Sequence, residues 1–330
     1  MENLMSILKA AVVGGIICMV GAFFAIIYSF TPLYAAGSYP VLLVLLSFAL
    51  IGAVLWFTGL QQKLEEFAGM GAMLHFGALV AVIAQMTYAT GKAKKSPIKG
   101  AATPLKEIYL KVIVIAFAFA AIVAVAVWAV NFYPSFNKST PGTLWRDINY
   151  EWFGKKYPYN GGGIVFGAVN CAPYPPGGVL IQPGSLAPPN AVPPAQPGTL
   201  PQGIVAGVDY MVFLWAFGLG ALISAVSQAI VMITAIKLPT FFLISICLGA
   251  LGIPLGVTKL LVQKMGGGFQ ILIFDAGEAM TSTTYAFLAG TGGPEPWMPI
   301  TSVVCMLILL GVIGIGAGWT KLAMEKKKQG

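Results

Sequence analysis

Charge is scarce in this chain of 330 residues. Only 9% of its residues are Asp, Glu, Lys or Arg, and 58% are hydrophobic. A soluble globular domain has about 25% charged residues, so this class is excluded. Charge-free windows occupy residues 10–62, 112–137, 210–236, 238–258 and 296–320. A membrane-spanning helix needs about 20 apolar residues, so the sequence predicts an all-α integral membrane protein.

The residues of common catalytic sites are also scarce. The chain has one histidine, His75, and one arginine, Arg146. No Ser/His/Asp set, no His/Cys cluster with metal-ligand spacing and no nucleotide motif is found, so we expect neither an enzyme nor a cofactor. The lysines that produce the net charge of +8 stand at predicted helix ends. They indicate membrane topology and contact with anionic lipid, not a nucleic-acid partner.

The two halves of the chain resemble each other. Val13–Pro32 aligns with Leu219–Pro239 at an offset of about 206 residues, and Leu46–Leu60 aligns with Ser245–Leu260. Each half is then expected to end in one more apolar span, at 112–133 and 298–320. This order of events predicts an internal repeat.

Both halves also contain a glycine-rich break. Gly69 and Gly71 lie in "KLEEFAGMGAML", and Gly266, Gly267 and Gly268 lie in "VQKMGGGFQIL". A non-helical break at membrane depth is tolerated only where it lines protein or water. Two such breaks predict two half-helices that meet around one pathway. Close packing of helices on small residues stays open as the alternative.

A proline-rich segment separates the halves. Residues 134–208 hold 13 of the 22 prolines, which excludes a span or a central strand. The sequence therefore predicts a first membrane repeat at 1–133, an irregular external loop at 134–208 and a second membrane repeat at 209–330.

Lysines predict the topology. Six lie in the 91–111 segment and four more in the C-terminal stretch "KLAMEKKKQG", and both clusters should be cytoplasmic. Six spans, with re-entrant or half-helical elements at about 66–90 and 265–290, satisfy this expectation. Eight spans, the alternative, would place the two clusters on opposite sides. With three spans in each half, the second repeat is inverted, both termini are cytoplasmic and 134–208 lies outside the cytoplasmic membrane.

Four stretches carry a family resemblance. "VGGIICMVG" (Val13–Gly21) and "KLEEFAGMGA" (Lys63–Ala72), with "LGALISAVSQ" (Leu219–Gln228) and "MGGGFQILIFDAGEAM" (Met265–Met280), resemble the stage V sporulation membrane proteins of the SpoVA type, AC and AE members. The resemblance covers roughly 10–90 and 213–290 and implies two fused units.

The chain departs from that family at three positions. His75 and Leu272 replace a proline that follows each glycine motif, and Glu278 replaces an asparagine. The resemblance implies a channel-like protein of the inner membrane that moves small solutes, such as dipicolinate with calcium.

Two acidic residues stand out in the second repeat. Asp275 and Glu278 are three residues apart and share one helix face. Buried acids in a membrane usually face a cavity or partner, so we expect a site that shares a cation or a proton, with Ser282 and Thr283 as further oxygen ligands. The alternative is a solvated helix end.

Three polar residues complete the candidates for the pathway. His75 titrates in the physiological range if it reaches water, or is a hydrogen-bonded core residue. Gln228 and Gln85 either bridge helices or line the path.

Three functions fit these features. The first is a channel or transporter for small solutes or ions. The second is a membrane-anchoring or ion-conducting subunit of a larger complex, and the third is a structural, self-assembling membrane protein. The expected partners are the lipid bilayer and either further copies of the chain or other membrane subunits.

Overall fold

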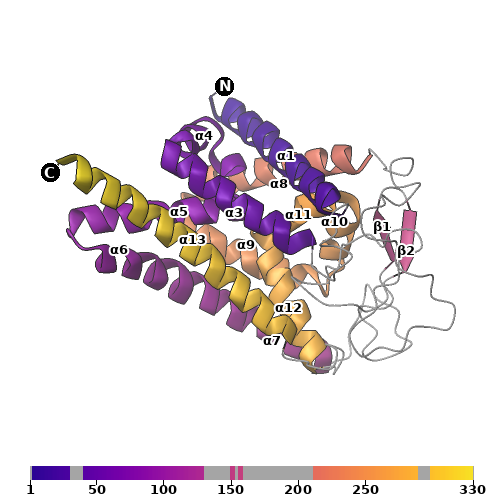
Figure 1. Ribbon diagram of the computed structural model, residues 1–330. Coiled ribbons are helices and arrows are strands. Elements are labelled where there is room, and N and C mark those ends of the chain that lie inside the picture. Colours follow the sequence, from indigo (N-terminus) through magenta and orange to yellow (C-terminus); the bar gives the residue numbers. More distant parts are fainter. Residues whose placement is uncertain are drawn as a thin grey trace, which may run out of the picture.

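The computed structural model describes residues 2–29, 40–129, 149–152, 155–158, 211–288 and 298–329. These residues form a helical bundle with one small hairpin (Figure 1). The first half contains α1 (Glu2–Ser29), α3 (Pro40–Thr58), α4 (Leu60–Ala68), the 3₁₀ turn η1 (Gly69–Ala72), α5 (Phe76–Ala93), α6 (Pro97–Pro104), the π-helical η2 (Leu105–Val114) and α7 (Ile115–Ala129). The second half contains α8 (Met211–Thr234), α9 (Leu238–Gly252), α10 (Val257–Met265), α11 (Gly267–Gln270), α12 (Phe274–Leu288) and α13 (Met298–Gln329).

Four of the described helices are long and apolar enough to cross a membrane. They are Glu2–Ala25, Pro97–Ala129, Met211–Thr234 and Val303–Lys328. A fifth crossing is possible if Leu43–Thr58 and Leu60–Ala72, which meet at 96°, form one broken span. The prediction of a helical protein with membrane-spanning segments is thus supported.

The last helix of the first half begins earlier than predicted. The expected span was 112–133, but the helix starts at Pro97 and continues to Ala129, the last described residue before a gap. Ser96 accepts a hydrogen bond from the Lys99 amide, and Pro97 occupies the first helical position, which together form a good start signal. The lysines that follow do not stop the helix because lysine has a high helix propensity.

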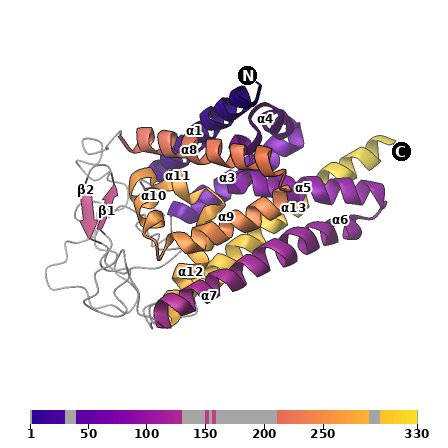
Figure 2. The same ribbon diagram turned by 180° about the vertical axis from the view of Figure 1, so that it is seen from behind.

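The hairpin pairs β1 (Asn149–Trp152) with β2 (Lys155–Pro158) in antiparallel register. Apart from this hairpin, the predicted loop 134–208 lies outside the described residues. In Figures 1 and 2, the hairpin lies at one end of the bundle, and the turn between α5 and α6 lies at the other end with the C-terminus.

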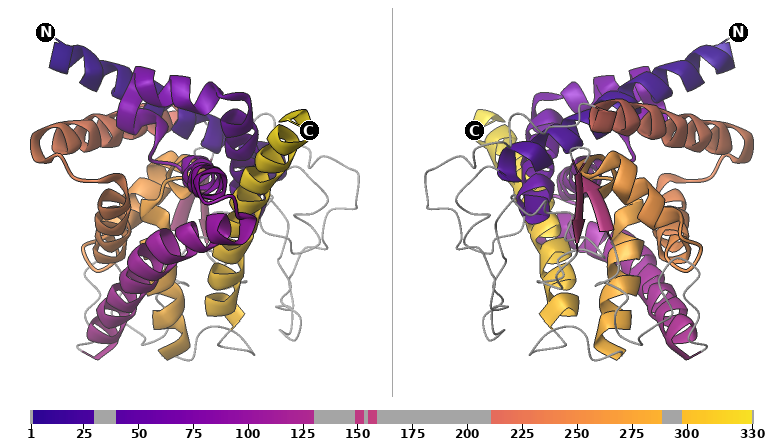
Figure 3. Two further views of the ribbon diagram at one scale, coloured as in Figure 1. Left: turned by 90° about the vertical axis from the view of Figure 1, so that its left-hand side faces the viewer. Right: turned by 90° about the vertical axis from the view of Figure 1, so that its right-hand side faces the viewer.

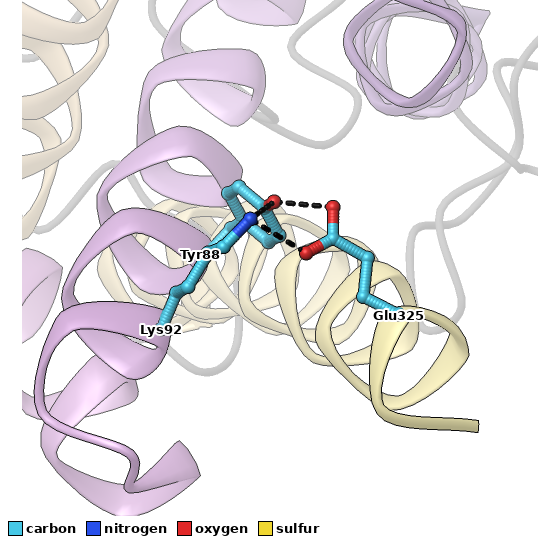
Figure 4. A network of polar contacts seen from close by, with 3 residues as sticks. All are labelled: Tyr88, Lys92 and Glu325. Carbon is cyan, nitrogen blue, oxygen red and sulfur yellow. Dashed lines mark hydrogen bonds and ion pairs between the residues drawn. The ribbon is translucent and has the colours of Figure 1, made fainter. Parts of the chain in front are cut away.

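Polar contacts tie α5 to the end of α13. Lys92 Nζ donates to Glu325 (2.8 Å) and to the Tyr88 hydroxyl (3.0 Å), and the Tyr88 hydroxyl donates to Glu325 (Figure 4). These hydrogen bonds raise the pKa of Lys92. Trp319 Nε1 donates to the Pro97 carbonyl (2.9 Å). The two lysine clusters predicted to share one side therefore lie together in the fold.

α1 and α8 pack against each other in antiparallel directions, on one side of the molecule (Figure 3). Gln228 Nε2 donates to Ser6 Oγ (3.0 Å), whereas a Cβ added to Gly220 would lie 2.6 Å from Cys18 Sγ. Later residues of α1 thus contact earlier residues of α8, so the two helices run in opposite directions. Small residues let the two backbones approach closely.

Candidate functional site

The two glycine-rich breaks share one backbone conformation. Gly69 has φ 51° and ψ −122°, and Gly266, at the matching position of the second half, has φ 52° and ψ −129°. Residues with a Cβ rarely adopt these backbone angles, which explains why glycine occupies both positions. In each half a short helical turn follows, and then a new helix begins, α5 at Phe76 and α12 at Phe274.

The breaks meet in the core of the protein. The Phe76 amide donates to the Ile271 carbonyl, and the Ile273 amide donates to the Leu74 carbonyl, both at 2.9 Å. His75 and Leu272 therefore lie opposite each other in an antiparallel bridge. Each break satisfies backbone groups that the other leaves without a helical partner. As a result, the N-termini of α5 and α12 lie next to each other.

The other glycines of the breaks sit against neighbouring backbone. A Cβ on Gly71 would lie 2.2 Å from the Ala10 carbonyl oxygen, and one on Gly268 would lie 2.6 Å from that of Cys18. A Cβ on Gly267 would also meet α1, at 2.4 Å from Ala25. The breaks thus serve close packing as well as a special conformation, so the packing interpretation of the glycines holds.

The acid pair lies at the start of α12 and is buried. The exposed fraction is 0% for Asp275 and 1% for Glu278, which rules out the solvated helix end. Ser282 Oγ donates to Glu278 Oε1 at 3.3 Å. Among the described residues, neither carboxylate oxygen of Asp275 has a hydrogen-bond partner. The structure therefore brings three predicted site residues together.

A buried carboxylate is costly unless a cation, a proton or hydrogen bonds compensate its charge. The partial positive charge at the N-terminus of α12 offsets a part of this cost. Lys264, the nearest lysine before the acids in the sequence, places its Nζ 5.4 Å from the ring centroid of Trp215. The geometry thus suits a site that takes up a proton or a hard cation.

Sequence reasoning missed two buried polar residues, Gln270 in α11 and Ser245 in α9. Among the described residues, both amide atoms of Gln270 and the hydroxyl of Ser245 have no hydrogen-bond partner. Gln270 was detectable as a polar side chain between the glycine break and Asp275. Ser245 was not detectable, because only tertiary packing brings α9 against α12. This packing is close: a Cβ on Gly249, one turn after Ser245, would lie 1.8 Å from the Phe274 carbonyl oxygen.

Thr283 directs its hydroxyl to its own helix and not to a site shared with the acids. Its hydroxyl donates to the carbonyl of Ala279 (2.9 Å) in its own helix. Within the described ranges, no group of three or more His, Cys, Asp or Glu side chains is arranged to hold a metal ion.

His75 caps a helix. Its Nδ1 accepts a hydrogen bond from the Ala78 amide (3.2 Å) at the start of α5, and its ring packs edge-on against Phe48. The side chain is buried. His75 is therefore a hydrogen-bonded core residue, and its backbone faces Leu272, which precedes Asp275 by one helical turn.

Gln228 holds the first break and not the acid pair. Its Oε1 accepts from the Met70 amide at 2.8 Å, while its Nε2 donates to Ser6 in α1. Gln85 similarly accepts from Trp56 Nε1 at 2.7 Å. Both glutamines bridge helices, which was one of the two predicted roles.

Comparison of the chain with protein-family models, with curated proteins and with solved structures found no match.

Proposed function

We propose that this protein is a channel- or transporter-like membrane protein that moves small solutes or ions, with Asp275 and Glu278 as its ion site. The burial of two carboxylates beside the bridge between the two breaks carries the proposal. Such groups in a membrane protein mark ion pathways and proton relays. The resemblance to SpoVA-type proteins supports a permeant of the dipicolinate and cation class.

The two halves form an inverted repeat around the bridge. Positions related by the offset from Gly69 to Gly266 have matching contacts: a Cβ on Gly52 would lie 2.0 Å from the Gly77 carbonyl oxygen, and one on Gly249 would lie 1.8 Å from that of Phe274. The same offset relates His75 to Leu272, and these two residues face each other. Equivalent residues that contact each other lie beside a two-fold axis, which is the arrangement of inverted transporter repeats.

Six helices span the cytoplasmic membrane in this proposal, namely α1, α3, α7, α8, α9 and α13. Each of the segments α4–α5 and α10–α12 enters the membrane and leaves it again on the side from which it entered. The contacts between Lys92 and Glu325 and between Trp319 and Pro97 support one shared cytoplasmic end for the first four lysines of 91–111 and for the lysines near the C-terminus. The segment 134–208 is then outside.

Flux through reconstituted protein tests the ion site. In liposomes, Asp275→Asn combined with Glu278→Gln should lower proton flux, or dipicolinate flux with calcium, at least tenfold, or about 1.4 kcal/mol. The amides keep the shape of the side chains but remove the charge. Thr283→Val is the matched control on the same helix, and it should conduct like the wild type because Thr283 bonds its own backbone. Wild-type flux in the double variant would overturn the site.

Labelling tests the sidedness. In a background without the native cysteines, Lys94→Cys and Lys327→Cys should react with an impermeant maleimide only in inside-out vesicles. Ser185→Cys, in the proline-rich segment, should react only in right-side-out vesicles. Labelling of positions 94 and 327 from opposite sides would contradict the six-span arrangement.

A further inference from the structure

Charged side chains occupy the outer face of η2. Lys111 Nζ lies 2.6 Å from Glu107 Oε2, and their side chains are 56% and 35% exposed. Lys106 is exposed beside them, as are Leu110 and Val114. We refer to these five residues as the η2 face.

The η2 face lies within a candidate span. The helix Pro97–Ala129 has 33 residues, and the hydrocarbon core needs about 20 of them. Tyr109 of η2 donates its hydroxyl proton to the Leu307 carbonyl (2.6 Å), near the middle of the charge-free stretch 296–320 that includes most of α13. Lys106, Glu107 and Lys111 lie within one helical turn of Tyr109, so they lie at the depth of that apolar stretch. Charges exposed to lipid at this depth are costly, so something other than hydrocarbon should cover them.

The equivalent face of the second half differs in charge. This comparison rests on the repeat proposed above. Thr281 donates to the Ala120 carbonyl in α7, and a Cβ on Gly318 in α13 would lie 2.7 Å from the Ala84 carbonyl oxygen. Ala84 and Thr281 are related by the same offset as Gly69 and Gly266. Their partners, Ala120 and Gly318, are therefore equivalent positions.

This equivalence matches Lys106, Glu107, Leu110 and Lys111 with Val304, Cys305, Ile308 and Leu309. All four matched side chains in α13 are exposed, and none is charged. That face suits contact with lipid. At these matched positions the first half has charged residues and the second half has none, so the depth of the helix alone does not explain the charges.

We infer that the η2 face is the surface through which two copies of this chain associate in the membrane. The face is self-complementary because it carries both charge signs. Lys106 and Glu107 are adjacent and lie at nearly the same depth. A two-fold axis along the membrane normal pairs Lys106 of each copy with Glu107 of the other, while Leu110 and Val114 supply apolar contact.

Exchanging the charges of Lys106 and Glu107 tests this interface. The measurement is the mass of the full-length protein in nanodiscs. The wild type should contain two copies. Glu107→Lys should give single copies because like charges then meet. Glu107→Lys combined with Lys106→Glu should restore two copies, although it leaves the Lys111 contact within the helix broken. A pair needed only within one helix would show no such rescue, and this outcome would overturn the proposal.

Cross-linking locates the contact. In a background without the other cysteines, Leu110→Cys should form an intermolecular disulfide under mild oxidation. The native Cys305, exposed on the equivalent face of α13, is the control and should not. Single-copy wild-type particles, or a different protein bound on this face, would overturn the inference. Flux through the Asp275 site is a separate readout, so failure of the interface and failure of the ion site are distinguishable.

Discussion

Gly249→Ala should destabilise the protein by about 3 kcal/mol, at the upper end of the usual cost of overpacking. A Cβ at this position would lie 1.8 Å from the Phe274 carbonyl oxygen, and one on Gly277 would lie 1.7 Å from that of Ile246. Backbone atoms cannot rotate away as a side chain can. Helices α9 and α12 would have to separate, and the start of α12, which carries Asp275, would move with them.

Thermal unfolding in detergent measures this effect. Gly52→Ala should behave in the same way, because its Cβ would meet the Gly77 carbonyl oxygen. Gly316→Ala in α13 is the matched control, since no atom lies within 4 Å of its Cβ position. That variant should keep or slightly raise the melting temperature, because alanine favours a helix over glycine by about 0.5–1 kcal/mol. Equal melting temperatures for Gly249→Ala and Gly316→Ala would refute the packing argument.

Gly69→Ala and Gly266→Ala should each cost about 1–3 kcal/mol, because their backbone angles are strained for any residue with a Cβ. Gly69→Ala should cost more. Its Cβ would lie 2.4 Å from Gln228 Oε1, the atom that accepts the Met70 amide. We expect both variants to lower flux as well, since a shifted break moves the bridge between Leu74 and Ile273.

A third variant separates strain from collision. Adding Gln228→Ala to Gly69→Ala removes the collision but not the backbone strain, so the two substitutions together should cost less than the sum of their separate costs. Melting temperatures of the four proteins in this cycle provide the measurement. Strictly additive losses would show that Gln228 does not press on the Gly69 position.

Local chemistry explains what was predictable from the sequence. Four of the five charge-free windows became part of helices long enough to cross a membrane, because an apolar helix satisfies its own backbone in any surroundings, whereas 238–258 holds the shorter helix Leu238–Gly252. Gly69 and Gly266 marked the breaks, because the need for glycine at positive φ is a property of the residue itself. Asp275, Glu278 and Ser282 were recognisable as a group since helical spacing places them on one face.

Contacts between distant segments decided the rest. The helix start at Pro97 was missed because lysines were taken as the edge of the span, whereas helix propensity carried the helix through them. Gln228 reaches Met70 from the other half of the chain, and the bridge joins Leu74 to Ile273, pairings that no local pattern specifies. Whether Asp275 and Glu278 were solvated or buried was equally open in the sequence. Burial depends on which helices cover a face. Helices α7 and α9 cover α12, and glycines on both sides of the contact permit the close approach of α9.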